Sequence, residues 1–182
     1  QSQGVVTHAP NTTTEANRLN LEIGRNLIVD SDGRIDVTGK GYRSSAGPGA
    51  PTNRYSSAGH GGMGGHHSDT INWNPGTTYG SVTSPTNCGS GGRGVSAGNS
   101  EGGSGGGAMM LVVANETVVH GGIHADWSWA GSYAGSGGSI YLITGKLSGN
   151  GKISAGSPGN SPVSTGGGGR IAGGRDARAE RG

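Results

Sequence analysis

The stretch GGSIYLITGKLSGNGKISAG, residues 137–156, contains the pattern that decides the fold. A glycine pair leads into the apolar run 140–143. Leu147 then precedes residues 149–151, and Ile153 follows them. Short runs of apolar and β-branched residues bounded by Gly, Asn and Ser predict strands, and Gly-Asn-Gly tolerates the positive φ of a tight turn. This unit therefore predicts a strand, a short turn, a second strand and then a glycine-rich excursion.

The unit recurs along the chain at a nearly constant spacing. Met109 and Ile140 are 31 residues apart, and Ile140 and Ile171 are again 31 apart. Ile123 and Ile153, in the second strand of their units, are 30 apart. A fixed period of this length is typical of repeat architectures, in which each unit packs on its neighbours.

An earlier copy occupies residues 19–37; every second residue is apolar in 19–23 and again in 35–37, and polar residues such as Glu22 fall between. A unit with one thin apolar stripe cannot bury it alone, but stacked copies can. We therefore predict an all-β, glycine-rich repeat solenoid, a parallel β-helix with long glycine-rich loops. The alternative is a β-sandwich of stacked hairpins, because each unit could also close as an antiparallel pair. The side chains expected to point inward are Leu21, Ile23, Ile28, Ile35, Val37, Met110, Val112, Val119, Ile123, Ile140, Leu142, Leu147, Ile153 and Ile171.

Composition favours a narrow core. Glycine fills 42 of 182 positions, apolar residues make up 29%, and there is no Phe. Ordinary glycine usage is about 7%. Two interpretations of the excursion 41–107 follow: a flexible coil, or extended threefold segments packed side by side, which glycine permits because it has no side chain. The aromatic residues within it favour ordered loops.

Three regions follow from these patterns, and together they predict one domain. Residues 1–18 form a polar lead that could serve as an assembly arm. Residues 19–172 form the glycine-rich repeat domain with its large loop 41–107, and residues 173–182 form a polar tail.

The segments GRIDVTGKGY, GAMMLVV with GGIHAD, GGSIYLITGKLSGNGKISAG and GGGGRIA together resemble the glycine-rich β-repeat modules of large secreted and surface proteins of bacteria and some protists. The resemblance covers roughly residues 19–172. It implies a fold similar to a parallel β-helix and a place in adhesins, cell-surface stalks or filament-like appendages. The enlarged first loop and the non-repetitive tail depart from the pattern.

Aromatic residues of the excursions are the candidates for a binding or assembly surface. They are Trp73, Tyr79, Trp127, Trp129 and Tyr133. Rings that stack on sugars would face solvent in the monomer, whereas rings that mediate assembly would become buried between copies.

Other candidate residues carry weaker signals. His60, His66 and His67 lie in HGGMGGHH and could hold a transition metal, but loop histidines are the plainer interpretation, and we expect no metal or cofactor. Cys88, the single cysteine, is a candidate for an intersubunit disulfide. Asn11 and Asn115 begin glycosylation triplets.

Several function classes are disfavoured. The carboxylates that a polysaccharide-acting enzyme would need are spread singly. With 13 Lys and Arg against 11 Asp and Glu, the charge is too balanced for nucleic-acid binding, and no apolar run reaches the 18 residues of a membrane span.

The sequence thus predicts a non-enzymatic, extracellular structural glycoprotein, a subunit or segment of a self-assembling surface filament, sheath or stalk whose partners are copies of itself. The alternative is an adhesive or carbohydrate-binding module that contacts surface glycans through its loop aromatics. A polysaccharide-acting β-helix enzyme is a minor alternative.

Overall fold

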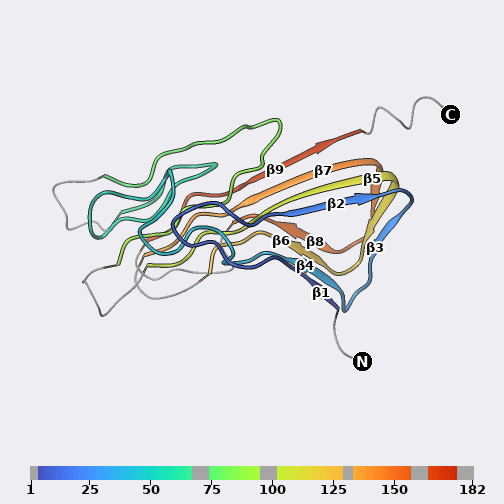
Figure 1. Ribbon diagram of the computed structural model, residues 1–182, viewed down its shortest axis with the longest axis horizontal. Helices are drawn as coiled ribbons and strands as arrows, with labels where there is room; N and C mark the ends of the chain where they lie inside the picture. The colour runs from blue at the N-terminus through green and yellow to red at the C-terminus, as the bar shows by residue number, and fades with distance from the viewer. Residues whose placement is uncertain (1–3, 67–73, 95–101, 129–132, 157–163, 176–182) are drawn as a thin grey trace.

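The computed structural model describes residues 4–66, 74–94, 102–128, 133–156 and 164–175. Within these ranges every regular element is a β-strand (Figure 1). In chain order the strands are β1 (Val5–Val6), β2 (Leu19–Ile23), β3 (Leu27–Val29), β4 (Arg34–Asp36), β5 (Ala108–Val119), β6 (Gly122–His124), β7 (Ser139–Ser148), β8 (Lys152–Ser154) and β9 (Arg170–Gly174).

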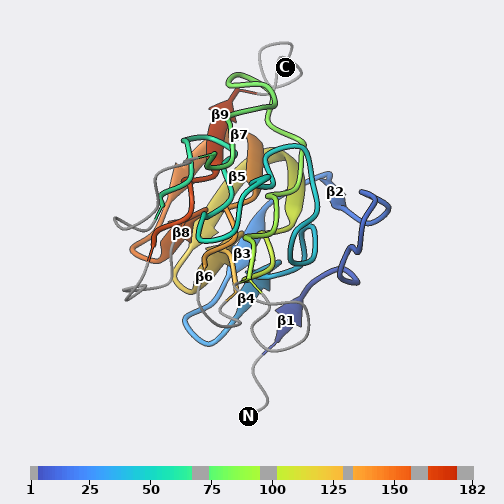
Figure 2. The same cartoon turned by 90° about the vertical axis from the view of Figure 1, so that its left-hand side faces the viewer.

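The strands form two sheets in which every paired neighbour is parallel. The short sheet has the order β1-β4-β6-β8. The long sheet has the order β2-β5-β7-β9, and β3 continues β2 along the same side of β5. Figure 2 shows the two sheets from one end of the strands. Tight turns such as residues 30–33 carry the chain from the long sheet to the short one.

Strand register follows the repeat spacing. Met109 lies beside Ile140, and Ile140 lies beside Ile171. In the short sheet Ile123 lies beside Ile153. The β5–β6 and β7–β8 units therefore each contribute one strand to each sheet, and residues 30 or 31 positions apart are lateral neighbours from β5 to β9. The first unit is separated from the second by the large excursion, so Leu19 lies beside Met109.

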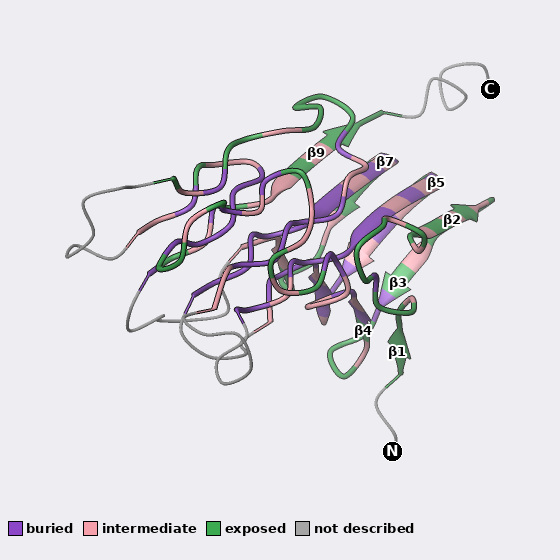
Figure 3. Ribbon diagram, turned by 60° about the vertical axis from the view of Figure 1, so that its left-hand side comes forward, coloured by how far each residue is buried: buried purple, intermediate pink, exposed green. Residues whose placement is uncertain are grey.

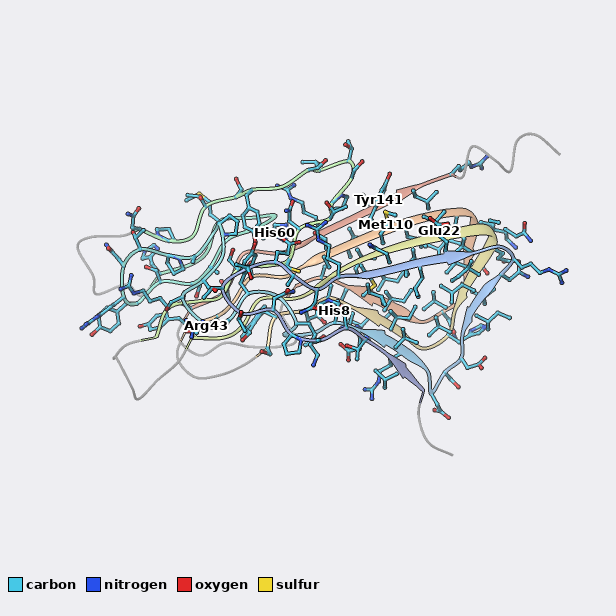
Figure 4. The ribbon with its side chains drawn as sticks, in the orientation of Figure 1. His8, Glu22, Arg43, His60, Met110 and Tyr141 are labelled. Carbon is cyan, nitrogen blue, oxygen red and sulfur yellow. The ribbon has the colours of Figure 1, made fainter. Side chains whose placement is uncertain are left out.

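The apolar core lies between the two sheets. Its buried members are Val29, Ile35, Val37, Met109, Leu111, Val113, Val119, Ile123, Ala125, Ile140 and Leu142. From Met109 to Val113 the buried side chains of β5 are the odd-numbered ones, so the prediction that Met110 and Val112 point inward is wrong by one residue. A one-residue shift moves a strand's side chains to the opposite face. Met110 and its neighbour Tyr141 lie on the outer face of the long sheet (Figure 4).

Three other expected core residues are exposed. The prediction for Ile28 is wrong, because its exposed fraction is 60% and the flanking Leu27 and Val29 pack on the core instead. Leu147 and Ile171 are paired with the buried Thr117 and Ile140, so they share the core-facing side, yet about half of each is exposed. Both lie where the sheets end.

The predicted parallel β-helix is wrong: the two sheets are open and the strands do not form a solenoid. The glycine-rich excursions leave the sheets and pack as a body of their own at one end of the strands (Figure 1). The alternative of stacked hairpins is also wrong, because consecutive units pair in parallel and the two strands of a unit belong to different sheets.

The second body, here called the glycine block, consists of the described residues in 38–66, 74–94, 102–107, 133–138 and 164–169. Its segments are extended, and they carry no assigned strands apart from one isolated bridge between Ser56 and His66. Figure 3 shows buried residues continuing from β5 and β7 into this block. Of the two interpretations of the large excursion, ordered extended segments are the one found in its described part.

Residues 133–138 show how the block is held together. Gly137 N donates to Gly167 O at 3.0 Å, and Ser136 N donates to Ser90 O at 2.9 Å. Ser136 O accepts from Gly106 N, and Ala134 O accepts from Ala58 N, both at 3.0 Å. One segment thus bonds four others, whereas a sheet strand bonds two in one plane. The segments are therefore bundled by backbone hydrogen bonds in more than one direction.

Close backbone approach explains why the block is built of glycine. A Cβ added to Gly138 would overlap the carbonyl oxygen of Gly107, and one added to Gly105 would overlap that of Gly89. Gly168, on the outside of the block, would meet nothing within 4 Å. Glycine is therefore required where segments touch and is replaceable where they do not.

Candidate functional site

The first feature that could support function is the open end of the sheets formed by β1 to β4, here called the leading end. A hollow of about 710 Å³ opens there, lined by Gly4, Val5, Val6, Leu21, Leu27, Ile28, Val29 and the residues from Asp30 to Ile35. Val5 and Val6 are 47% and 45% exposed. Apolar side chains therefore line an opening between the two sheets.

The opposite end, formed by β7 to β9, is here called the trailing end. A hollow of about 460 Å³ is lined there by Leu142, Thr144, Gly145, Lys146, Leu147, Gly173, Gly174 and Arg175. Ile171 of β9 is 53% exposed and Leu147 of β7 is 51% exposed. Apolar side chains on the core side of the sheets are thus exposed at both ends.

Strand edges are open at the same two places. Among the described residues, no strand pairs with the outer side of β1, β2 or β3 at the leading end, or of β8 or β9 at the trailing end. Free edges present unpaired N–H and C=O groups, which can bind a further strand. The leading end exposes one edge of each sheet and the trailing end exposes the other edge. Because all strands in each sheet are parallel, a strand added at either edge can keep the same direction.

The predicted aromatic surface is not assembled where the structure can be described. Trp127 and Tyr133 are each only 3% exposed. Tyr79 is half-buried; its hydroxyl donates to Cys88 O at 2.5 Å and lies 2.8 Å from Ser90 Oγ. These three rings help to fill the glycine block and do not present a face to a ligand. Trp73 and Trp129 lie outside the described residues.

The histidine cluster is also dispersed. His60 is fully buried, with Nδ1 at 2.8 Å from Gly137 O and its ring centroid 4.5 Å from that of Tyr79. Burial lowers the pKa of His60. His66 is half-buried in a bridge to Ser56, and His67 lies outside the described residues. No three His, Cys, Asp or Glu side chains of the described ranges lie together as metal ligands.

Cys88 is buried, and burial raises the pKa of its thiol to about 12. A thiol in this position cannot reach a second subunit without local unfolding, so the folded chain does not offer Cys88 for an intersubunit disulfide.

The two glycosylation candidates differ. Asn11 is 4% exposed; its amide nitrogen donates to Asn17 O and Lys40 O, both at 2.9 Å, and its oxygen accepts from the backbone of Ala16 and Asn17. A sugar on this nitrogen would displace those contacts. Asn115 is exposed at the irregularity of β5, where a sugar could be attached.

Ser154, His124 and Asp126 form a cluster that sequence reasoning missed because Ser154 lies in the next unit. Ser154 Oγ donates to Asp126 Oδ2 at 2.7 Å and lies 2.8 Å from His124 Nδ1. In a catalytic triad the imidazole lies between serine and carboxylate, whereas here the serine is in the middle. Asp126 also accepts from Gly156 N at 2.7 Å. The cluster therefore ties neighbouring units together and has no activated nucleophile.

Sequence reasoning also missed β1. The pair Val5–Val6 in an otherwise polar lead was the available signal, and the structure places it as the edge strand of the short sheet. No helix of the described part of the chain is both long and apolar enough to cross a bilayer. Comparison of the chain with family models, with curated proteins and with solved structures found no match.

Proposed function

We propose that the chain is a non-enzymatic structural protein, a subunit or segment of an extracellular filament, sheath or stalk that assembles through the open ends of its sheets. The observation that carries this proposal is the pair of open ends, each with free strand edges and half-exposed apolar side chains. Natural proteins usually protect such edges with charges, bulges or covering segments. Assembly covers these edges.

The glycine block supports the same role. Its segments are connected by backbone hydrogen bonds in several directions, which suits a structural element. The polar clusters around Asp126 and Ser90 have their oxygen atoms committed to structural hydrogen bonds. The extracellular location rests on composition alone: few charges and many Ser and Thr residues.

An adhesive or carbohydrate-binding module has less support, because Trp127 and Tyr133 are buried and cannot stack on a sugar. A polysaccharide-acting enzyme would need carboxylates converging in a groove. The residues that line the trailing-end hollow include no carboxylate. In the leading-end hollow the two carboxylates, Asp30 and Asp32, lie two residues apart in one turn and do not face each other across the opening.

Sedimentation velocity of the purified chain over a wide range of concentration, followed by negative-stain electron microscopy, tests the proposal. We expect the mean mass to rise with concentration and rods of uniform width to appear at the highest concentrations. A chain that sediments as a monomer throughout would overturn self-assembly as its role.

A further inference from the structure

The two sheets are offset by one strand. Here a layer means one strand position of the long sheet together with the strand of the short sheet that faces it. β2 and β3 face β4, β5 faces β6, and β7 faces β8, which gives three complete layers. β1 lies beyond these layers at the leading end, and β9 lies beyond them at the trailing end. The described chain therefore begins with a half-layer of the short sheet and finishes with a half-layer of the long sheet.

Each half-layer has a core-facing side chain that no described strand of the other sheet covers. Val6 is beside Ile35, which is 3% exposed, yet Val6 itself is 45% exposed. Ile171 is beside the fully buried Ile140, yet it is 53% exposed. Paired residues of a parallel sheet point to the same face, so Val6 and Ile171 both point toward the interior layer. Among the described strands, no strand of the long sheet packs over Val6, and no strand of the short sheet packs over Ile171.

We propose that β9 of one copy and β1 of the next copy combine into one complete layer, so that Val6 packs on Ile171 across the junction. This inference rests on the proposed function and names the partner as a second copy of this chain. The offset allows both sheets to continue at once: β1 adds to the free edge of β8, and β9 adds to the free edge of β2.

Extending the observed register predicts the new neighbours. Val6 follows Ile35, Ile123 and Ile153 in the short sheet, so it would lie beside Ile153 of the preceding copy. Leu19 follows the same rule in the long sheet and would lie beside Ile171. Glu22 would lie beside Gly174, which has no side chain to clash with it; Glu22 lies on the free outer strand in Figure 4.

The two hollows lie where the incoming strands of a neighbouring copy would have to fit. The larger one is lined by Val5 and Val6, on the side that β9 of the preceding copy would enter. The smaller one lies beside Gly173 and Gly174 of β9. Because the contact joins different surfaces and adds strands in parallel, it does not close on itself as a twofold dimer would, and it leads to open-ended growth.

A charge placed on β1 tests the junction with a matched control. Val6→Lys puts an ammonium group opposite Ile171, whereas Val5→Lys puts the same group on the other face of the strand, beside the exposed Arg34. We expect Val6→Lys to raise the concentration needed for assembly at least about tenfold, a change that corresponds to about 1.4 kcal/mol, and Val5→Lys to change it far less. Equal effects of the two variants would overturn the inference.

Cysteine pairing provides a second test that does not depend on weakening assembly. Val6→Cys and Ile153→Cys in one chain lie three strand spacings apart, about 14 Å, beyond the roughly 7 Å limit between Cα atoms joined by a disulfide. Between copies they would be lateral neighbours. We expect oxidation to give a ladder of covalent multimers on denaturing gels, and the single-cysteine variants to give dimers at most, since Cys88 is buried.

The outcomes separate this inference from the proposed function. Assembly of the wild-type chain without a ladder from the double variant would show that copies join elsewhere, which overturns the half-layer junction and leaves the structural role standing. A wild-type chain that stays monomeric would overturn both. A ladder together with a large Val6→Lys effect supports both.

Discussion

The sheets and the glycine block are held together by opposite means. Between the sheets, side chains such as Leu111 and Ile140 are fully buried against one another, and each such burial contributes about 1.5–3 kcal/mol. In the block the backbones touch directly, and segments such as 133–138 are bonded to several neighbours. Each of those hydrogen bonds contributes about 0.5–1.5 kcal/mol net.

The two regions therefore differ in what they tolerate. A core of side chains can lose a methyl group and relax around the gap, because the surrounding side chains can shift. Backbones already in contact have no such freedom, so an added methyl group must push whole segments apart. One methyl carbon should therefore matter more when it is added to the block than when it is removed from the core.

The largest effect is expected for Gly138→Ala. The new Cβ would overlap the carbonyl oxygen of Gly107 and the backbone of Gly106, and these are main-chain atoms that cannot turn away as a side chain can. We expect a loss of about 3 kcal/mol or more in the free energy of unfolding, at or above the upper range for overpacking. Urea denaturation followed by circular dichroism measures it.

Gly168→Ala is the matched control in the same block. Its Cβ would meet nothing within 4 Å, and its φ is not in the positive range. We expect a change within about 1 kcal/mol, in either direction, because alanine also restricts the unfolded chain. Equal losses at positions 138 and 168 would show that backbone contact does not set the requirement for glycine.

The next effect is the removal of one methyl group from the core by Ile140→Val. Ile140 is fully buried, and this substitution typically costs about 0.5–1.5 kcal/mol in the free energy of unfolding. Ile171→Val, on the same register line but 53% exposed, should cost less in the monomer. A larger loss for Ile140→Val than for Gly138→Ala would reverse the comparison between the two regions.

The repeat spacing accounts for the lateral neighbours from β5 to β9, because a unit of constant length brings equivalent residues side by side. It could not predict how the units close. Two parallel strands per unit fit a solenoid as well as a pair of open sheets, and the choice depends on where the glycine-rich excursions pack. The inward face of β5 was misassigned because Met109, Met110, Leu111, Val112 and Val113 are all apolar, so no alternation marks the buried side.

The glycine block was the least predictable region. Its order depends on contacts between segments far apart in the chain, such as Ala58 with Ala134 and Gly137 with Gly167. Glycine carries no side chain whose pattern could reveal such pairs. The buried positions of Trp127, Tyr133 and Cys88 follow from those contacts, which is why their exposure could not be inferred from sequence.

The smallest effect at neutral pH, and one specific to the block, concerns His60. Its Nδ1 carries the proton given to Gly137 O, because a carbonyl oxygen only accepts; Nε2 is buried without a partner among the described residues. Burial chiefly lowers its pKa below 6.5, and the charge of Arg170 adds to this, against the opposing influence of the Gly137 hydrogen bond and Glu15.

The sign of the pH dependence follows from this. Below about pH 6.5 the unfolded chain binds a proton that folded His60 resists, so the free energy of unfolding must fall as the pH drops through this range and level off below the folded-state pKa. His60→Gln retains a donor for Gly137 O and removes the titration, so its stability should fall less between pH 7 and pH 5. Chemical denaturation of the wild type and of His60→Gln at several pH values measures the two slopes; equal slopes would show that the block does not sense acid through this histidine.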